Sequence, residues 1–295
     1  MPDSPATDLL DVPGAKLYYE VRGSGPLLLV IGQPMTSEPF SPLAGLLAAD
    51  HTVLTYDPRG LGQRAVEDPS SDVTPQIQAD DLARLVDAVG GGPADLFASS
   101  GGAVTGLALA ARHPGQIRVL VAHEPPVTEL LPDAEHVRAV VDQIEEAYRD
   151  GGTAPAWGKF ASLVMYDGLV TADGVPPASW LPGGADSSGT EESAGQDAGQ
   201  APPEPSQKQL ADDELFFLRM LKPFTRYEPD VDALRSGRPR VVIAVGEASR
   251  DEVAARSARA LAAQLGIATT ACPGHHGGFM DDPEAFASRL RETLA

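Results

Sequence analysis

Apolar residues form two kinds of segment that alternate along most of the chain. Residues 27–31 are a continuous apolar run, which is typical of a strand covered on both faces. Residues 74–89 instead carry apolar side chains at helical spacing, and these share one face: Ile77, Leu82, Leu85, Val86 and Val89. The alternation predicts an α/β fold in which helices cover both faces of a mostly parallel, doubly wound sheet with right-handed crossovers.

The same patterns predict the remaining core elements. Further strands are expected at 16–21, 52–56, 95–98, 117–122, 241–245 and 267–272. Further helices are expected at 41–49, 101–112, 252–265 and 283–294. The regular alternation stops between residues 127 and 237, a stretch too long for a single crossover. We therefore expect three parts: an N-terminal part of the core at 1–127, an inserted helical cap at 128–236 and a C-terminal part of the core at 237–295.

The expected cap carries helical patterns of its own, at 135–148, 156–165 and 212–221. In the third of these, apolar side chains crowd several faces, which favours packing between cap and core and, in addition, a wall for a substrate. Residues 173–209 contain almost no apolar side chains, so we expect a low-complexity loop there.

Charge and cysteine content narrow the possible partners and location. With 42 acidic and 22 basic side chains the formal net charge is −20, which repels phosphate backbones and anionic membrane surfaces. We therefore expect neither a nucleic-acid partner nor a membrane partner, and no segment approaches the roughly 20 apolar residues of a membrane helix. The single cysteine, Cys272, cannot form an internal disulfide, and the first residues do not resemble a signal peptide. A soluble, cytoplasmic protein is expected.

Residues 95–104 predict a strand that turns sharply into a helix, with a serine at the corner. Such a turn strains the backbone of the corner residue, so the residues two positions away on each side must be small. Ala98 and Gly102 meet this requirement around Ser100, whereas a corner at Ser99 would put Phe97 at a crowded position. Ser100 is thus the candidate nucleophile, and a serine that only caps a helix is the alternative.

A serine hydroxyl needs a base within hydrogen-bond reach to attack near neutral pH. His276 lies directly after the last predicted strand, where a loop at the carboxyl edge of the sheet can carry its imidazole over Ser100. A metal site is the alternative reading of His275 and His276. Adjacent histidines on an extended loop point in different directions, however, and the segment offers no further ligand. We expect neither a metal nor a cofactor.

With these features the chain resembles the α/β-hydrolase superfamily over nearly all of its length outside the cap. Four segments carry the resemblance, in the family's order. They are the loop Ile-Gly-Gln-Pro at 31–34, the Asp-x-Arg-Gly-x-Gly element at 57–62, the elbow Ala-x-Ser-x-Gly at 98–102 and the histidine motif at 274–278. The elbow departs from the usual Gly-x-Ser-x-Gly by one methyl group, and Ile31 stands where relatives usually have histidine. We expect the element at 57–62 to shape a turn.

The resemblance implies an oxyanion hole formed by two backbone N–H groups. One is that of Gly101, after the nucleophile, and the other is that of Gln33, because Pro34 has no N–H. The side-chain amide of Gln33 could contact substrate or face outward.

The resemblance also implies a carboxylate partner for His276, at one of two positions. The more common position, in the loop after the strand that follows the cap, offers Glu247 and Asp251. The other, after the preceding strand, offers Glu124. We rank Glu124 first because a carboxylate at the end of an apolar run needs a partner such as an imidazole N–H. Glu247, Asp251 and the absence of an acid stay open.

These features together predict a serine hydrolase that cleaves a carboxylic ester, thioester or lactone of a small molecule through an acyl-enzyme on Ser100. Two alternatives stay open. One is a non-hydrolytic cyclase, acyltransferase or lyase on the same fold, and the other is a ligand-binding protein with an incomplete triad. Dehalogenase or epoxide hydrolase chemistry is disfavoured, because the family branches with those activities carry aspartate where Ser100 stands.

Overall fold

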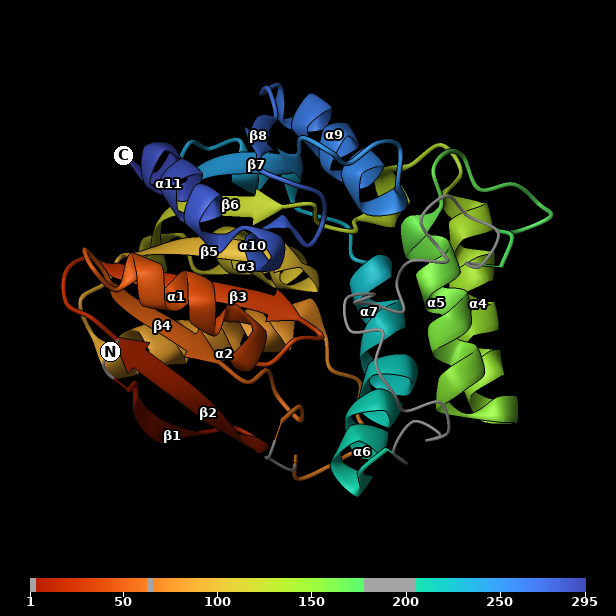
Figure 1. The fold of residues 1–295 in the computed structure, drawn as a ribbon, viewed down its shortest axis with the longest axis horizontal. Helices are drawn as coiled ribbons and strands as arrows, with labels where there is room; N and C mark the ends of the chain where they lie inside the picture. The colour runs from red at the N-terminus through yellow and green to blue at the C-terminus, as the bar shows by residue number, and fades with distance from the viewer. Residues whose placement is uncertain (1–3, 63–65, 178–204) are drawn as a thin grey trace, which may run out of the picture.

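The computed structural model describes residues 4–62, 66–177 and 205–295, and Figure 1 shows their arrangement. Eight strands form one sheet in the order β1-β2-β4-β3-β5-β6-β7-β8. Pairing is antiparallel between β1, β2 and β4, and parallel from β4 to β8. The strands are β1 (Ala6–Val12), β2 (Ala15–Arg22), β3 (Leu27–Gln33), β4 (Thr52–Tyr56), β5 (Ala94–Ser100), β6 (Ile117–His123), β7 (Arg240–Gly246) and β8 (Thr270–Cys272).

Strand β3 shows why these runs form central strands. All seven of its residues are buried, and their side chains alternate between the two faces of the sheet. Leu27, Leu29 and Ile31 join the core cluster on one face, whereas Leu28 and Val30 join the cluster on the other. A strand covered on both faces must be apolar throughout, which is the pattern that the sequence shows.

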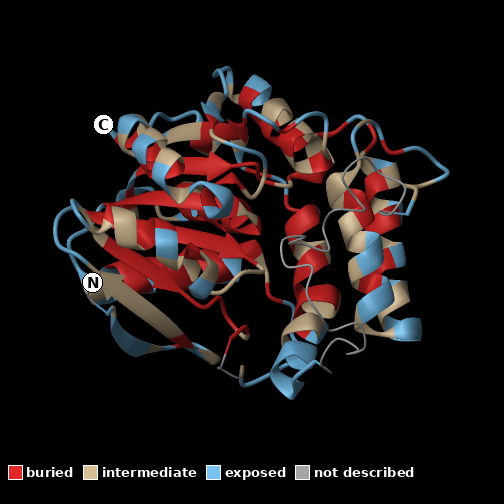
Figure 2. Cartoon of the chain, in the orientation of Figure 1, coloured by how far each residue is buried: buried red, intermediate tan, exposed pale blue. Residues whose placement is uncertain are grey.

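Helices cover both faces, as Figures 1 and 2 show. α1 (Ser41–Leu47) and α11 (Pro283–Leu294) pack together on one face, and α10 (Gly278–Asp281) lies beside them. The other face carries α2 (Pro75–Val89), α3 (Gly101–Arg112), α8 (Val231–Leu234) and α9 (Val253–Leu265). Single 3-10 turns complete the core at η1 (Glu38–Phe40), η2 (Pro114–Gln116) and η3 (Thr128–Leu130). The α/β fold class is confirmed.

The inserted helices lie beside the carboxyl ends of the parallel strands (Figure 1). They are α4 (Ala134–Gly151), α5 (Thr153–Met165), α6 (Gln207–Leu215), the π-helical turn η5 (Phe216–Met220) and α7 (Leu221–Thr225). α6, η5 and α7 run on as one helix between the sheet and the pair α4–α5.

Two sequence-based predictions about these helices need correction. The third inserted helix begins at Gln207, not at 212, because Ser206 and Gln209 form a capping box that starts it earlier. The end of the predicted loop at 173–209 is therefore helical, and residues 178–204 of that loop lie outside the described residues. The apolar side chains that crowd several faces at 215–220 lie on the π-helical turn, which shifts the helix register by one residue.

The core holds two further differences. Strand β1 was not predicted, because it is an edge strand whose residues are mostly exposed and therefore carry no apolar run. In α2, Ile77 is 38% exposed although the pattern places it on the buried face, and Gln78 beside it is fully buried. The buried amide oxygen of Gln78 accepts hydrogen bonds from Gln33 and Tyr56.

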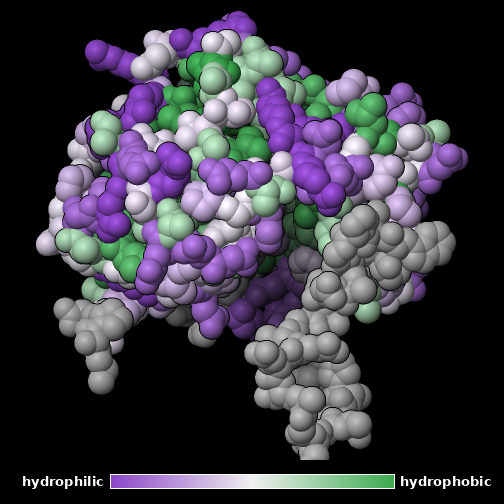
Figure 3. Space-filling model, turned by 45° about the horizontal axis from the view of Figure 1, so that its top comes forward, coloured by the Kyte–Doolittle hydropathy of each residue, from purple (hydrophilic) through white to green (hydrophobic). Residues whose placement is uncertain are grey.

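The surface visible in Figure 3 is mainly polar. The face drawn in Figure 3 is covered mainly by hydrophilic residues, with hydrophobic ones scattered among them. Among the described residues, none of the helices combines the length and the hydropathy needed to cross a membrane.

Candidate active site

Ser100 ends strand β5 and occupies the N-cap position of helix α3, at the carboxyl edge of the sheet. Its backbone has φ 55° and ψ −126°, a region that residues other than glycine rarely adopt. The hydroxyl is not used to cap the helix. This geometry is the one expected of a nucleophile elbow, in which the turn lifts the serine side chain above the end of the strand.

The small neighbours of Ser100 allow this turn to form. A Cβ on Gly102 would lie 2.6 Å from Cα of Gly32 in β3, so only glycine lets α3 approach the sheet this closely. The additional methyl group of Ala98 is accommodated opposite Gly106, where a Cβ would lie only 3.3 Å away from it. The departure from the usual elbow pattern is thus matched by a glycine one turn into the helix.

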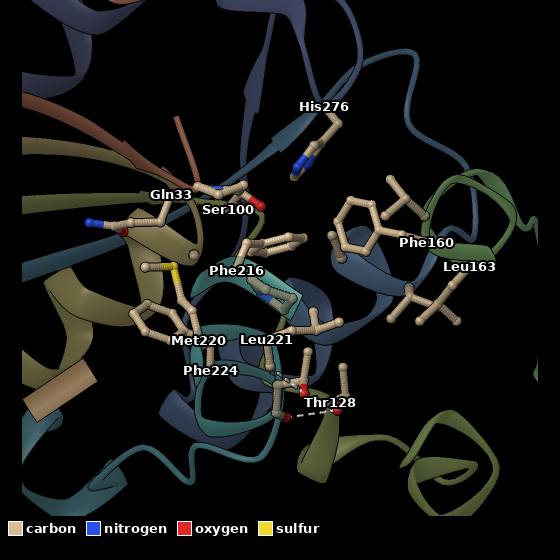
Figure 4. A pocket seen from close by; sticks show the side chains of 17 residues that line it. Gln33, Ser100, Thr128, Phe160, Leu163, Phe216, Met220, Leu221, Phe224 and His276 are labelled. Carbon is tan, nitrogen blue, oxygen red and sulfur yellow. Dashed lines mark hydrogen bonds between the residues drawn. The ribbon is translucent and has the colours of Figure 1, made fainter. Parts of the chain in front are cut away.

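Glu124 and His276 meet next to this elbow. Glu124 follows β6 with φ 47° and is 1% exposed. Its Oε2 lies 2.6 Å from Nδ1 of His276, and its Oε1 accepts a hydrogen bond of 2.9 Å from the Gly246 N–H. The His276 ring, carried by the loop after β8, and the Ser100 hydroxyl point into the same cavity (Figure 4).

The charge of Glu124 determines which nitrogen of His276 carries the proton. Burial alone would raise the pKa of Glu124, but the hydrogen bond and charge interaction with His276 outweigh burial and lower this pKa to about 2. Near neutral pH the carboxylate can only accept, so Nδ1 of His276 donates to it. Nε2 of the neutral ring is then left with a lone pair on the side of the cavity.

His123 lies behind His276, with ring centroids 6.0 Å apart and planes 22° apart. It is fully buried, and its Nδ1 is 3.1 Å from the hydroxyl of Ser99. Burial lowers the pKa of His123 to about 4, so the ring is neutral near pH 7. The buried ring of His123 therefore places no positive charge next to His276. Burial also raises the pKa of the Cys272 thiol to about 12, in keeping with a packing role for that residue.

The two expected oxyanion donors adjoin each other beside Ser100. Gln33 pairs in register with Ser100, and a Cβ on Gly101 would lie 3.0 Å from the Gln33 carbonyl oxygen. Both residues line the cavity, and Gly101 opens helix α3, whose N-terminus favours negative charge.

The sequence left two orientations open for the Gln33 side chain, toward the substrate or toward solvent, and the structure shows neither. The amide is buried and hydrogen-bonded within the core. Figure 4 shows it turned away into the core. Its Nε2 donates to Tyr56 Oη at 2.8 Å and to Gln78 Oε1 at 2.9 Å, and its Oε1 accepts from Thr105 at 3.3 Å. This buried network holds the residue that carries the second donor. Sequence reasoning missed it, although a glutamine within the apolar pattern of 74–89 is a usable signal.

The other candidate residues lie apart from this group. Asp251 is paired with Arg259 at 3.2 Å and its side chain is 70% exposed. Glu247 is exposed as well. His275 turns outward and pairs with Asp281 at 3.1 Å. Among the three candidate acids, Glu124 is therefore the one brought to His276.

A cavity of about 660 Å³, measured with its opening, adjoins Ser100. Its walls come from the inserted helices and from the loops at the carboxyl ends of the strands. The third inserted helix, in which the sequence predicts a wall for a substrate, contributes Phe216, Met220 and Leu221 to the lining, whereas the contribution of Phe160 and Leu163 from α5 was not predicted. Within the described ranges, no three His, Cys, Asp or Glu side chains are grouped so that they could hold a metal ion.

Comparison with known proteins agrees with this architecture. Residues 27–289 match the model of the alpha/beta hydrolase family. The chain is 29% identical over 290 residues to the uncharacterized hydrolase YraK of Bacillus subtilis (strain 168), which covers 97% of this chain and 94% of that protein.

Solved structures show the same fold. A thermophilic esterase from Thermogutta terrifontis matches with a TM-score of 0.69 at 17% identity, over 99% of this chain and 98% of that one. The enol-lactonase from Burkholderia xenovorans LB400 matches with a TM-score of 0.64 at 17% identity, over 97% and 99%. Together with the family match, these findings establish the class: the chain belongs to the alpha/beta hydrolase family. The resemblance read from the four sequence segments is confirmed, and the relatives support a hydrolytic enzyme.

Proposed function

We propose that the protein is a serine hydrolase that cleaves a carboxylic ester, thioester or lactone of a small molecule. The observation that carries this proposal is the strained Ser100 facing the same cavity as His276, whose ring is hydrogen-bonded to the buried Glu124. A serine with a positioned base, an ionised carboxylate and backbone donors has the parts that acyl transfer requires.

In the proposed reaction, Ser100 Oγ attacks the carbonyl carbon while Nε2 of His276 takes the serine proton. Glu124 holds the ring in the Nδ1-protonated form and stabilises the imidazolium. The N–H groups of Gly101 and Gln33 bind the oxyanion, and loss of one such donor costs roughly 100- to 1,000-fold in kcat. His276 then protonates the leaving group, and water activated by the same ring cleaves the acyl-enzyme. The inserted helices act as a cap over the substrate.

Hydrolysis of p-nitrophenyl acetate by the Ser100→Ala variant tests the proposal. We expect kcat to fall on the order of 10⁴- to 10⁶-fold. Ser99→Ala is the matched control, because Ser99 is the adjacent serine but is buried against His123, and its rate is expected to stay close to that of the wild type. Undiminished activity of Ser100→Ala would reject the proposal. An inactive wild type whose Ser100 also fails to react with a fluorophosphonate would favour a non-hydrolytic activity or a binding protein.

A further inference from the structure

The cavity beside Ser100 is lined almost entirely by apolar side chains. The inserted helices contribute most of them, as Figure 4 shows: Phe160, Leu163, Phe216, Met220, Leu221 and Phe224. Among the described lining residues there is no Asp, Glu, Lys or Arg, and His276 is the one titratable group. The chain carries 42 acidic and 22 basic residues, so their absence from this wall is a marked local departure. A charged group against this apolar wall would lose its hydration and gain no oppositely charged side chain as a partner.

The polar side chains in the wall have their donors engaged by the protein. Thr128 Oγ1 donates to the Thr225 carbonyl at 2.8 Å, and Thr225 Oγ1 donates to the Leu221 carbonyl at 2.9 Å. The amide of Gln33 is turned into the buried network with Tyr56. The side-chain donors that remain free are thus at the end of the cavity where the reaction is proposed, and the rest of the wall offers mainly apolar contact.

The apolar wall is held in place from behind. Trp157 stacks on Phe216 with ring centroids 5.4 Å apart and planes 16° apart, and its Nε1 donates to Asp213 at 3.1 Å. Phe216 and Met220 of the π-helical turn face the cavity, while Phe217 packs against Tyr148. A wall fixed in this way binds an apolar group without a large loss of side-chain freedom.

We infer that the cavity binds an uncharged, apolar portion of the substrate. The preferred substrates are then neutral esters, thioesters or lactones with an alkyl or aryl group of several carbons next to the reacting carbonyl or its leaving oxygen. This inference rests on the proposed function, because it takes Ser100 as the reacting group.

Two substrate series test it on the wild-type protein. In p-nitrophenyl esters from acetate to hexanoate, and in alkyl acetates from methyl to hexyl, kcat/KM is expected to rise about fourfold per methylene in at least one series. A carboxylate at the end of the substrate's acyl chain should reverse this rise in kcat/KM. Mono-p-nitrophenyl glutarate is therefore expected to react on the order of 100-fold more slowly than p-nitrophenyl pentanoate.

The inference is overturned if both series are flat, or if the glutarate ester reacts as fast as the pentanoate, while Ser100 still reacts with a fluorophosphonate. Failure of the fluorophosphonate reaction itself would instead reject the proposed function, so the two failures are distinguishable.

Two adjacent phenylalanines provide a matched pair of variants. Phe216→Leu changes the wall, and is expected to lower the hexanoate-to-acetate ratio of kcat/KM at least about threefold, the loss of roughly one buried methylene contact. Phe217→Leu makes the same change at a residue that does not line the cavity, and should leave that ratio within about twofold of the wild-type value. Equal ratios in the two variants and the wild type would contradict the role of this wall. If either variant does not fold, the wild-type series still decides.

Discussion

At the scale of single residues, the proposed site depends on a carboxylate that the sequence could rank but not assign. Three acidic residues stood at positions that the family uses, and their spacing does not distinguish them. The structure does so by burial: Glu124 is 1% exposed and bonded to His276, whereas the Asp251 side chain is 70% exposed and pairs with Arg259. A buried carboxylate without such a partner would be costly.

Replacing this carboxylate tests its role. Glu124→Gln keeps the shape but removes the charge, so it no longer enforces the Nδ1-protonated form of His276. We expect kcat for p-nitrophenyl acetate to fall on the order of 10³- to 10⁴-fold. Glu247→Gln and Asp251→Asn are the matched controls and should stay within about twofold of the wild type. A large loss in either control, with Glu124→Gln active, would move the acid to that residue.

The buried, neutral ring of His123 should make the free energy of unfolding depend on pH. Its folded pKa of about 4 lies below the ordinary 6.5, so the unfolded chain takes up the proton first as the pH falls. The contribution of the neutral His123 to the free energy of unfolding is then fully present above about pH 6.5 and is lost as the pH falls from 6.5 to 4. In urea unfolding, the wild type should lose roughly 2 kcal/mol more between pH 7 and pH 5 than His123→Asn. An identical pH dependence in the two proteins would contradict the neutral buried ring.

At the scale of elements, the contact of α3 with β3 controls the position of Ser100. Gly102→Ala would put a Cβ 2.6 Å from Cα of Gly32, so the helix must move away from the sheet. We expect a loss of about 1–3 kcal/mol in the free energy of unfolding and a lower rate of ester hydrolysis. Gly158→Ala is the control, because its Cβ meets nothing within 4 Å in helix α5 and should stabilise by about 0.5–1 kcal/mol. Equal effects of the two substitutions would refute the close contact.

The elements that the sequence predicts well are those whose burial decides their composition. β4 and α11 have the predicted bounds, and most other core elements differ only at their ends. The edge strand β1 has no apolar pattern because most of its side chains meet solvent. The π-helical turn at 216–220 has no signature of its own in a run of apolar residues, so the sequence predicts a substrate wall in this helix but not which of its side chains form it. Ser100 and His276, in contrast, could be proposed as site residues from the sequence because the elbow and the loop at the strand end have local signatures.

At the scale of the whole molecule, a buried ion pair joins the inserted helices to the core. Arg256 of α9 binds both oxygens of Asp133, at the start of α4, at 2.7 and 2.9 Å, and Asp133 also accepts from the Val170 N–H at 2.7 Å. The side chains of the pair are 10% and 6% exposed. The orientation of the inserted helices over Ser100 therefore depends in part on this contact.

Removing one residue of this ion pair should lower the free energy of unfolding more than replacing both. Asp133→Ala leaves the Arg256 guanidinium buried without a counter-charge, and is expected to lower the free energy of unfolding by about 3–5 kcal/mol. Asp133→Ala combined with Arg256→Met should recover a large part of this loss, as measured by urea denaturation. Strictly additive effects of the two substitutions would show that the pair is not coupled.

The catalytic account of the whole molecule requires that residues 176 positions apart in the chain, Ser100 and His276, act on one substrate. Peptide mapping by mass spectrometry after reaction with a fluorophosphonate measures this most directly, in the wild type and in His276→Gln. The account predicts a single adduct on Ser100 in the wild type, formed on the order of 10³-fold more slowly in the variant. An adduct on another residue, or an equal rate in both proteins, would contradict it.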